Sequence, residues 1–378
     1  MKRVIIIGGG FGGFYSSLAL QKIPNIQTVL IDPTDYFLYI PLIHEVSVGE
    51  IPKSIPQIPY KNTLQGTIHI KSKAKKIILK EKIVQLDNDR TISWDYLIIA
   101  PGSLPNLFIK GTENKLTLNN LDDAIKIRNS LRNLINHKEN SIGLIGEGPT
   151  GIELASEIAE LLNKLNLKVE IHQFMYFKRY FRDDPPLDIM LKRRMRKLGV
   201  KIHPGEPVRE VINKKIITEK NEYELDVIFV CTGVKPVLIE SELDFKNGYP
   251  VDDYCLVKGY KSVYAIGDAS LYQKNGNKLP NLAQVAEKQA KYIVFDICRR
   301  IHNKKRKKFD PQISGILISA GKYFAIGRIL NILILKGFLA WFAKRSLYFL
   351  KIFLVKRKFN LIKHYIISCF FPNKFFII

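Results

Sequence analysis

Cysteine is scarce in this sequence. The 378 residues include four, at positions 231, 255, 298 and 369, and no two of them form a CxxC pair. We therefore expect no disulfide framework, and each thiol is expected to be a small buried side chain rather than a redox group. No metal site is expected either. The start of the chain, Met1 to Ile7, lacks the layout of a secretory signal and runs directly into a strand pattern, which predicts a cytoplasmic protein.

Acidic residues are also few. The chain has 35 Asp and Glu against 59 Lys and Arg, a net charge of +24. Such an excess favours an anionic partner, either nucleic acid, anionic lipid or an acidic substrate. The alternative is a coding bias toward Lys, Ile and Asn, so the location of the charge matters more than its total.

The last segment, 311–378, contains 11 Lys or Arg and no acidic residue. No uncharged stretch in it approaches the ~18 residues of a membrane-spanning helix. Lys344, Lys351 and Lys358 recur every seven residues among aromatic and aliphatic side chains, which predicts an amphipathic helix lying on an anionic membrane surface. The alternative is a core-packing helix or one that forms a homodimer. Nucleic acid is not expected as a partner, because too much aliphatic surface separates the basic and aromatic residues.

A glycine-rich motif opens the chain. Gly8, Gly10 and Gly13 follow the apolar run 4–7 in the pattern GxGxxG, and the next strand-like run ends at Asp32. In this pattern the glycines shape a turn, let the backbone approach a pyrophosphate, and let a helix pack closely on a strand. A carboxylate about 20 residues further on accepts ribose hydroxyls. These four residues predict a dinucleotide site.

The same pattern returns in the middle of the chain. A strand at 142–145 precedes Gly146, Gly148 and Gly151, and a helix and the strand KVEIHQF follow. Two such modules imply two dinucleotides. An enzyme that takes hydride from a nicotinamide and passes electrons onward needs a flavin as intermediary. A chain of this length also favours two domains plus an appendage.

Three further segments, ISWDYLIIAPGSLPN, YELDVIFVCTGVKP and SVYAIGDASLY, make the sequence resemble the two-dinucleotide flavoprotein reductases. DYFLYIPLIHEVSVGEI after Asp32 and LPNLAQVAEKQAKYIVFDI after Asp268 narrow the resemblance to the type II NADH:quinone oxidoreductases, which are single-subunit, non-pumping respiratory dehydrogenases. This resemblance covers essentially the whole chain. It implies bound FAD, NADH or NADPH as substrate, and a quinone as acceptor.

The resemblance also implies roles for single residues. Asp268 would bond the ribityl chain of FAD, Gln284 would lie beside the flavin at the quinone pocket, and Glu153 would face the flavin near the same pocket. The simpler alternatives are a turn residue at Asp268, a helix-start residue bonding the backbone at Gln284, and a solvated or salt-bridged Glu153.

The sequence departs from the family pattern at four positions, Pro101, Lys288, Gln173 and Glu147. The last two bear on the nicotinamide side, because we expect Gln173 at the strand end where an acid normally meets the ribose. With Gln173 neutral and basic residues close behind, we expect poor discrimination against NADPH. A carboxylate aimed at a pyrophosphate is repelled, so Glu147 must turn away, pair with a basic residue, or indicate a site that no longer binds a dinucleotide.

The sequence therefore predicts an α/β protein with two Rossmann-like dinucleotide-binding domains and a C-terminal amphipathic membrane-associated element. The expected FAD domain covers 1–115 and 236–320, the NAD(P) domain 116–235, and the C-terminal element 321–378. We expect a ping-pong NAD(P)H:quinone oxidoreductase bound peripherally to the cytoplasmic side of the cell membrane. A sulfide:quinone oxidoreductase and a flavoprotein that binds a partner or senses redox state are the alternatives.

Overall fold

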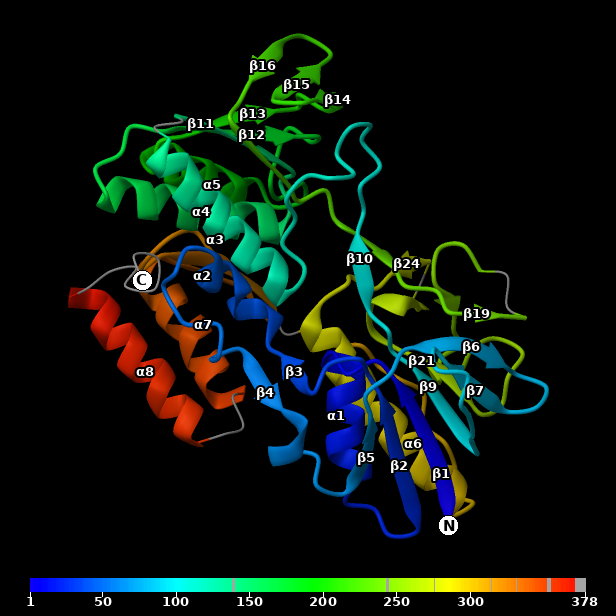
Figure 1. The fold of residues 1–378 in the computed structure, drawn as a ribbon. Helices are drawn as coiled ribbons and strands as arrows, with labels where there is room; N and C mark the ends of the chain where they lie inside the picture. Colours follow the sequence, from blue (N-terminus) through cyan, green and yellow to red (C-terminus); the bar gives the residue numbers. More distant parts are fainter. Residues whose placement is uncertain are drawn as a thin grey trace. The chain divides into compact units, whose positions relative to one another are not determined.

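The chain forms two compact units in a computed structural model that describes residues 1–137, 140–242, 245–274, 276–313, 315–330, 332–351 and 355–370. The first unit comprises Met1–Leu38, Gln57–Leu104 and Val234–Ile313, and the second Tyr39–Pro56, Pro105–Gly233 and Ser314–Ile378. Figure 1 shows the elements of both units along the chain.

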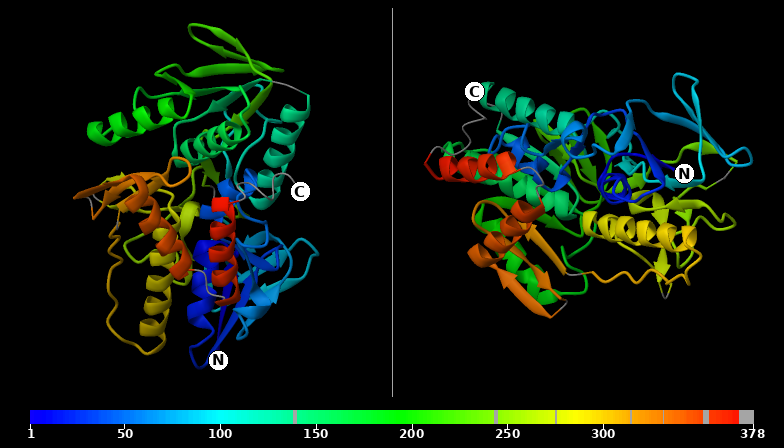
Figure 2. Two further views of the ribbon diagram at one scale, coloured as in Figure 1. Left: turned by 90° about the vertical axis from the view of Figure 1, so that its left-hand side faces the viewer. Right: turned by 90° about the horizontal axis from the view of Figure 1, so that it is seen from below.

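A five-stranded parallel sheet forms the centre of the first unit, in the order β21-β9-β1-β2-β5. The central strand has four consecutive buried apolar residues, as expected for a strand covered on both faces. Helices α1 and α6 lie against each other beside this sheet (Figures 1 and 2). The bounds are β1 Lys2–Ile7, β2 Ile26–Ile31, β5 Thr67–Ile70, β9 Tyr96–Ile99, β21 Val263–Ala265, α1 Phe11–Leu20 and α6 Ala283–Ile301.

Smaller pieces complete this unit. The sheet β19-β6-β7-β8 has antiparallel β6-β7 and β7-β8 pairs. Two-residue to three-residue strands and short 3₁₀ turns make up the rest. The bounds are β3 Tyr36–Leu38, β4 Gln57–Pro59, η2 Tyr60–Asn62, β6 Ala74–Ile78, β7 Ile83–Leu86, β8 Thr91–Ser93, β10 Ser103–Pro105, β18 Val234–Pro236, β19 Glu240–Ser241, β20 Tyr249–Pro250, η3 Gly267–Ala269, β22 Ser270–Leu271, β23 Gln273–Lys274 and β24 Asn277–Lys278.

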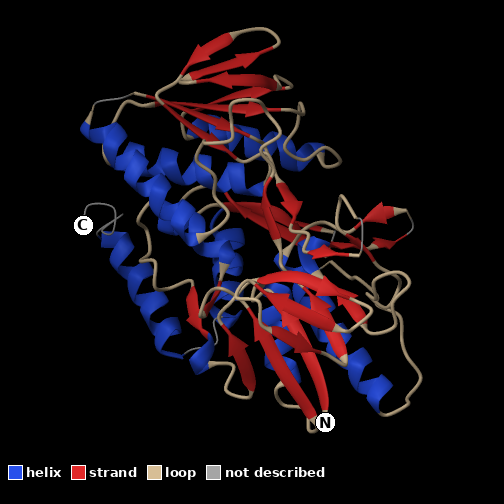
Figure 3. Cartoon of the chain, turned by 45° about the vertical axis from the view of Figure 1, so that its right-hand side comes forward, coloured by secondary structure: helices blue, strands red, loops and turns tan. Residues whose placement is uncertain are grey.

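The second unit has a four-stranded parallel sheet in the order β13-β12-β11-β17. Helix α4 packs on this sheet. The antiparallel sheet β14-β15-β16 and the parallel sheet enclose an apolar core that includes Ile145, Phe174 and Ile216. Figure 3 shows strands and helices of the chain by colour. The bounds are β11 Ser141–Ile145, β12 Glu170–Met175, β13 Val200–Pro204, β14 Val208–Ile212, β15 Lys215–Thr218, β16 Glu222–Glu224, β17 Val227–Val230, α3 Leu121–Asn136, α4 Pro149–Lys164 and α5 Pro185–Lys197.

The C-terminal segment belongs to this second unit. An antiparallel sheet, β25 Gly315–Ser319, β26 Ala325–Ile329 and β27 Leu333–Lys336, leads into α7 Gly337–Lys351 and α8 Val355–Phe370. Strand β25 packs on α4. The short elements η1 Ile40–Leu42 and α2 Ile43–Ser47 join the same unit, where α2 packs on α3 and α4.

The predicted fold class, with two Rossmann-like units, is confirmed, but the compact units differ from the predicted domain bounds. Residues 39–56, 105–115 and 315–320 lie in the second unit, although we expected them in the first domain, and residues 234 and 235 lie in the first unit. The described part of the tail belongs to the second unit and is not a separate appendage. The physical reason is that α2, α4 and α7 share buried charged side chains, described below. Among the described residues, no helix is both long and apolar enough to cross a membrane.

Candidate functional site

The first glycine turn joins β1 to α1. Gly8 has φ +93°, and a Cβ there would come within 2.2 Å of the Ala100 carbonyl oxygen. A Cβ at Gly13 would lie 1.7 Å from the Gly8 carbonyl oxygen. At Gly10, by contrast, a Cβ would meet nothing within 4 Å. The turn is therefore closed on its inner side and open at the start of α1, where backbone N–H groups can bind a pyrophosphate. These residues fit a dinucleotide.

Asp32 follows β2 directly and bonds to this turn. The Gly9 N–H donates to Asp32 Oδ2 at 2.6 Å, and the Thr34 N–H donates to Oδ1 at 2.8 Å. The Tyr60 hydroxyl donates to the Gly9 carbonyl at 3.1 Å, and a Cβ at Gly9 would come within 1.8 Å of that hydroxyl. Gly9, in the middle of the turn, has no room for a side chain. The carboxylate that bonds to the turn is therefore supplied by Asp32 at the strand end.

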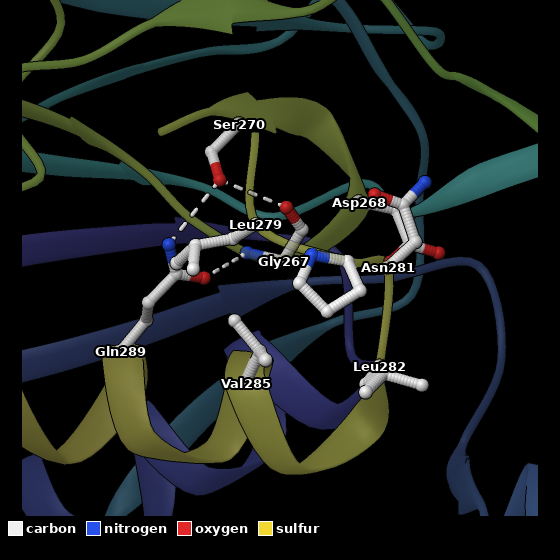
Figure 4. A pocket seen from close by; sticks show the side chains of 9 residues that line it. Gly267, Asp268, Ser270, Leu279, Asn281, Leu282, Val285 and Gln289 are labelled. Carbon is white, nitrogen blue, oxygen red and sulfur yellow. Dashed lines mark hydrogen bonds between the residues drawn. The ribbon is translucent and has the colours of Figure 1, made fainter. Parts of the chain in front are cut away.

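Asp268 lies in η3, beside a small pocket formed with the start of α6 (Figure 4). The Ser103 hydroxyl donates to Asp268 Oδ2 at 2.6 Å. Buried Gln289 accepts the Gly267 N–H at 2.8 Å, and Gln289 Nε2 donates to the Ser270 hydroxyl at 3.3 Å. Sequence reasoning missed Gln289, which holds in place the turn that presents Asp268.

Gln284 is the second residue of α6 and is partly exposed. Its neighbours Leu282 and Val285 line the pocket that contains Asp268. The structure therefore brings Gln284 and Asp268 to the same region of the first unit. Its predicted place beside a quinone stays a prediction.

The second glycine turn joins β11 to α4 and repeats the geometry of the first. Gly146 has φ +124°, and a Cβ there would come within 2.2 Å of the Cys231 carbonyl oxygen. A Cβ at Gly151 would lie 2.5 Å from the Gly146 carbonyl oxygen, whereas at Gly148 it would meet nothing within 4 Å. The start of α4 is thus open to a ligand in the same way as the start of α1.

Glu147 occupies the position that Gly9 has in the first turn. The Tyr176 N–H donates to Glu147 Oε2 at 3.1 Å, and the Phe177 N–H donates to Oε1 at 3.3 Å. Within the described part of the chain, no basic side chain lies at ion-pair distance from Glu147. Of the three predicted possibilities, the carboxylate takes the first, because it points to the loop that follows β12.

The two sheets have the same register at their turns. The Gly8 N–H donates to the Ile31 carbonyl at 2.9 Å, and the Gly146 N–H donates to the Phe174 carbonyl at 2.9 Å. The residue that follows each of these carbonyls is therefore the equivalent strand end.

The expected position of Gln173 is therefore wrong. The residue equivalent to Asp32 is Met175, which is fully buried. Gln173 lies two positions earlier inside β12, where its Nε2 donates to the Gly146 carbonyl at 2.9 Å and its Oε1 accepts the Tyr180 hydroxyl at 2.6 Å. The expectation failed because a residue's place in a strand depends on pairing, which sequence spacing alone does not reveal.

Glu153, on α4, is salt-bridged. Its Oε1 pairs with Lys344 of α7, its Oε2 lies 3.5 Å from His44 Nδ1, and it accepts the Ser319 N–H at 3.3 Å. Burial by itself raises the pKa of Glu153, but the Lys344 ammonium, with the Ser319 N–H, holds that pKa below its ordinary value. Burial lowers the pKa of His44. Glu153 is therefore ionised and His44 neutral at neutral pH.

A second buried ion pair lies in the same unit. Arg345 of α7 pairs with Glu45 of α2, and Arg345 also donates to the Tyr365 hydroxyl of α8. Glu157 is buried nearby, one helical turn after Glu153, and burial, with Glu45 and Glu50, raises its pKa to about 8. Glu157 is therefore mostly protonated at neutral pH.

These contacts correct the prediction for the tail. Lys344 is 4 % exposed, so it cannot share a membrane-facing row with the other two lysines. Lys351 is partly exposed, and the side chain of Lys358 lies outside the described residues. A sequence signal for the pairing did exist, since a buried acid such as Glu45 within the run PLIHEVSVGEI requires a cation.

The cysteines offer no reactive thiol among the described side chains. Cys231, Cys255 and Cys298 are unbonded, and burial raises the pKa of Cys231 to about 12. A thiol with such a pKa is a poor nucleophile. No three His, Cys, Asp or Glu side chains in the described ranges are placed to hold a metal ion.

Comparison with known proteins agrees with this geometry. The family described as pyridine nucleotide-disulphide oxidoreductase matches residues 2–290. A type II NADH:quinone oxidoreductase of Haemophilus influenzae is 26% identical, over 92% of this chain and 93% of its own. An alternative NAD(P)H-ubiquinone oxidoreductase C1 of Arabidopsis thaliana is 25% identical, over 85% and 72%. The structure of NDH2 from Plasmodium falciparum in complex with NADH matches the fold with a TM-score of 0.88 at 18% identity, over 99% of both chains.

The glycine turns generate a first prediction. Gly146→Ala places a Cβ against the Cys231 carbonyl at positive φ, so we expect it to lower the free energy of unfolding by about 2 kcal/mol or more. Gly148→Ala is the matched control and should unfold like the parent, because its Cβ has open space. Urea denaturation without added nucleotide measures both. Equal stability of the two variants would contradict the described turn.

A second prediction concerns Asp268. Asp268→Ala removes an acceptor for flavin hydroxyls, so the purified protein should contain less flavin, with a loss of about 1–3 kcal/mol in binding. Asp89→Ala, which removes an exposed carboxylate of the same unit, is the control. Absorbance of released flavin per protein is the measurement, and full retention in the Asp268 variant would exclude the contact.

A third prediction follows from Glu157. Its pKa is about 8 in the folded chain against an ordinary 4.5, so the folded state keeps a proton that the unfolded state releases. The parent should therefore lose stability as pH rises between these values, by roughly 1.4 kcal/mol per pH unit. Glu157→Gln lacks this loss, so its melting temperature relative to the parent should rise from about pH 5 to about pH 8. An unchanged difference would show that Glu157 titrates normally. Glu219→Gln, an exposed site, should show no such trend.

Proposed function

Since the chain belongs to the pyridine nucleotide-disulphide oxidoreductase family, we propose that it is an FAD-dependent NAD(P)H:quinone oxidoreductase of the type II, non-pumping kind. The observation that supports this most is the presence of two glycine turns with open helix starts, one in each unit. The names of the matched relatives supply the electron donor and the quinone acceptor.

The first unit is the proposed FAD domain. Backbone N–H groups after Gly10 would bind the pyrophosphate, Asp32 would accept the ribose hydroxyls, and Asp268 would accept ribityl hydroxyls. Bound FAD supplies the ability to accept a hydride from a nicotinamide and to pass two electrons to a second substrate.

The second unit would bind NAD(P)H at Gly146, Gly148 and Gly151. In this proposal the second glycine turn binds only the electron donor. NAD(P)⁺ can therefore leave before the quinone binds, which is a ping-pong order. Overall, NAD(P)H, one proton and a quinone give NAD(P)⁺ and a quinol. In this proposal the first product leaves from the start of α4.

Reduction of a quinone takes up two protons, and Glu153 is the proposed residue that organises them. Its carboxylate is ionised beside Lys344, and His44 lies 3.5 Å from Oε2. Lys344 and His44 can each hold a proton next to that carboxylate. Gln284 is the proposed polar contact on the flavin side.

The alternatives receive less support. A sulfide:quinone oxidoreductase needs reactive paired thiols, and Cys231 is a half-buried residue whose thiol pKa is raised by burial. The departures from the family pattern at Glu147 and Gln173 favour the other alternative, a flavoprotein that binds a partner or senses redox state without turnover. That argument weakens because Glu147 points to backbone amides rather than to the open helix start.

Peripheral membrane docking forms the second part of the proposal. Large apolar side chains stand exposed on α7 and α8, with Leu339 70%, Leu350 68% and Phe359 68% exposed. Such a surface fits the interface of an anionic membrane on the cytoplasmic side, where the basic tail adds electrostatic attraction. A homodimer contact is the competing use of this surface.

Anaerobic spectroscopy tests the enzymatic proposal. The protein purified in mild detergent should show a flavin spectrum, lose the flavin absorbance on addition of NADH or NADPH, and regain it on addition of a short-chain quinone. A flavin that neither nucleotide bleaches would refute the proposed donor. A bleached flavin that the quinone leaves unchanged would refute the acceptor.

A fourth prediction tests docking. The triple variant Leu339→Ser, Phe342→Ser, Leu350→Ser should lose binding to anionic vesicles, because each side chain contributes about 1 kcal/mol or more when buried in lipid. Substituting exposed Phe108 and Ile189 by Ser is the control and should leave vesicle binding unchanged. Co-sedimentation is the measurement. Undiminished binding together with loss of a dimer would instead assign the surface to self-association.

A further inference from the structure

In both units a carboxylate connects the glycine turn with the end of the second strand, but the two units supply it from opposite sides of this contact. In the first unit, the strand-end carboxylate of Asp32 bonds to the middle residue of the glycine turn, Gly9. In the second unit, the middle residue of the turn, Glu147, supplies the carboxylate. That carboxylate bonds to the loop after the strand, at Tyr176 and Phe177.

Two features explain this difference, one at the strand end and one at the glycine turn. The strand end of β12 is Met175, which is fully buried and has no polar hydrogen-bonding group to offer. At the turn, the Tyr60 hydroxyl leaves no room for a side chain at Gly9, whereas Glu147 is partly exposed and extends across. In both units a carboxylate therefore bridges the glycine turn and the end of the second strand.

We propose that Glu147 is the carboxylate that accepts the adenosine ribose hydroxyls of the nicotinamide nucleotide, and that it makes the chain prefer NADH to NADPH. The inference rests on the proposed function, because it requires that the second turn bind this nucleotide. A carboxylate at this place hydrogen-bonds a ribose diol and repels a 2′-phosphate.

Each oxygen of Glu147 accepts one backbone N–H and keeps one lone pair for a hydroxyl. In the first unit Asp32 Oδ2 likewise accepts one backbone N–H, from Gly9, and keeps one lone pair, whereas Asp32 Oδ1 accepts both the N–H and the hydroxyl of Thr34.

The expectation of weak discrimination against NADPH rested on a neutral Gln173 at the strand end and on the basic residues that follow it. The register places Met175 there instead, which is neutral too, so the carboxylate that opposes those cations comes from the turn.

The exposed cations after β12 are the competing influence. Arg182 stacks on the Phe177 ring with its guanidinium carbon 4.3 Å from the ring centroid, and Arg179 is exposed. If these residues decided the specificity, they would bind the 2′-phosphate and favour NADPH. The two readings predict opposite preferences, so they can be separated.

The test measures NAD⁺ and NADP⁺ binding to the flavin-containing protein by titration calorimetry. The parent should bind NAD⁺ at least about tenfold more tightly. Glu147→Gln should weaken NAD⁺ by about ten- to a hundredfold, as for a lost charge-assisted hydrogen bond, and should not weaken NADP⁺. Glu147→Gly, which copies Gly9, should act in the same direction and serves if the Gln variant does not fold.

Glu170→Gln removes the same charge from the other end of β12 and should leave both affinities unchanged. A parent that prefers NADP⁺, with the preference lost in Arg179→Gln/Arg182→Gln, would overturn the inference. Equal weakening of both nucleotides by Glu147→Gln would overturn it too, because Glu147 would then only brace the loop. If the parent binds neither NAD⁺ nor NADP⁺, and neither NADH nor NADPH bleaches its flavin, the proposed function itself fails.

Discussion

The close approach of backbone to backbone at the two glycine turns is the constraint on which both units depend. Gly8 lies against the Ala100 carbonyl and Gly146 against the Cys231 carbonyl, each at positive φ. Gly13 and Gly151 in turn lie against the Gly8 and Gly146 carbonyls, so each helix packs closely on its turn and the first helical N–H groups stay open. The anion-binding ends of α1 and α4 are a consequence of that packing.

Buried charge is the second organising feature, and it unites elements that are distant in the chain. Glu153 pairs with Lys344 across 191 residues, and Glu45 with Arg345 across 300. Removing one partner of such a pair leaves an uncompensated buried charge, which is strongly destabilising. The basic tail therefore has two roles in the structure. Lys344 and Arg345 neutralise buried carboxylates of the second unit, and apolar side chains such as Leu339 and Leu350 are exposed.

The carboxylates of the two turns show how one chemical requirement can be met from different places in the chain. What matters is a negative oxygen between the turn and the strand end, and either side can supply it. In the sequence, Glu147 is a departure from the family pattern, because it places a negative charge inside the second glycine motif. In the folded unit the Glu147 carboxylate accepts two backbone N–H groups, at a strand end where buried Met175 provides no carboxylate.

Local patterns in the sequence determined the two nucleotide-binding modules, because glycine spacing, strand hydrophobicity and helix periodicity are properties of neighbouring residues. The resemblance to flavoprotein reductases added the expected role of Asp268 and the expected family. Tertiary structure alone decided which strand residue is equivalent to Asp32, where the Glu147 carboxylate points, and that Lys344 is buried. Each of these depends on pairing between segments far apart in the chain, and the energy of a buried charge or a strand register is set by partners that no local window contains.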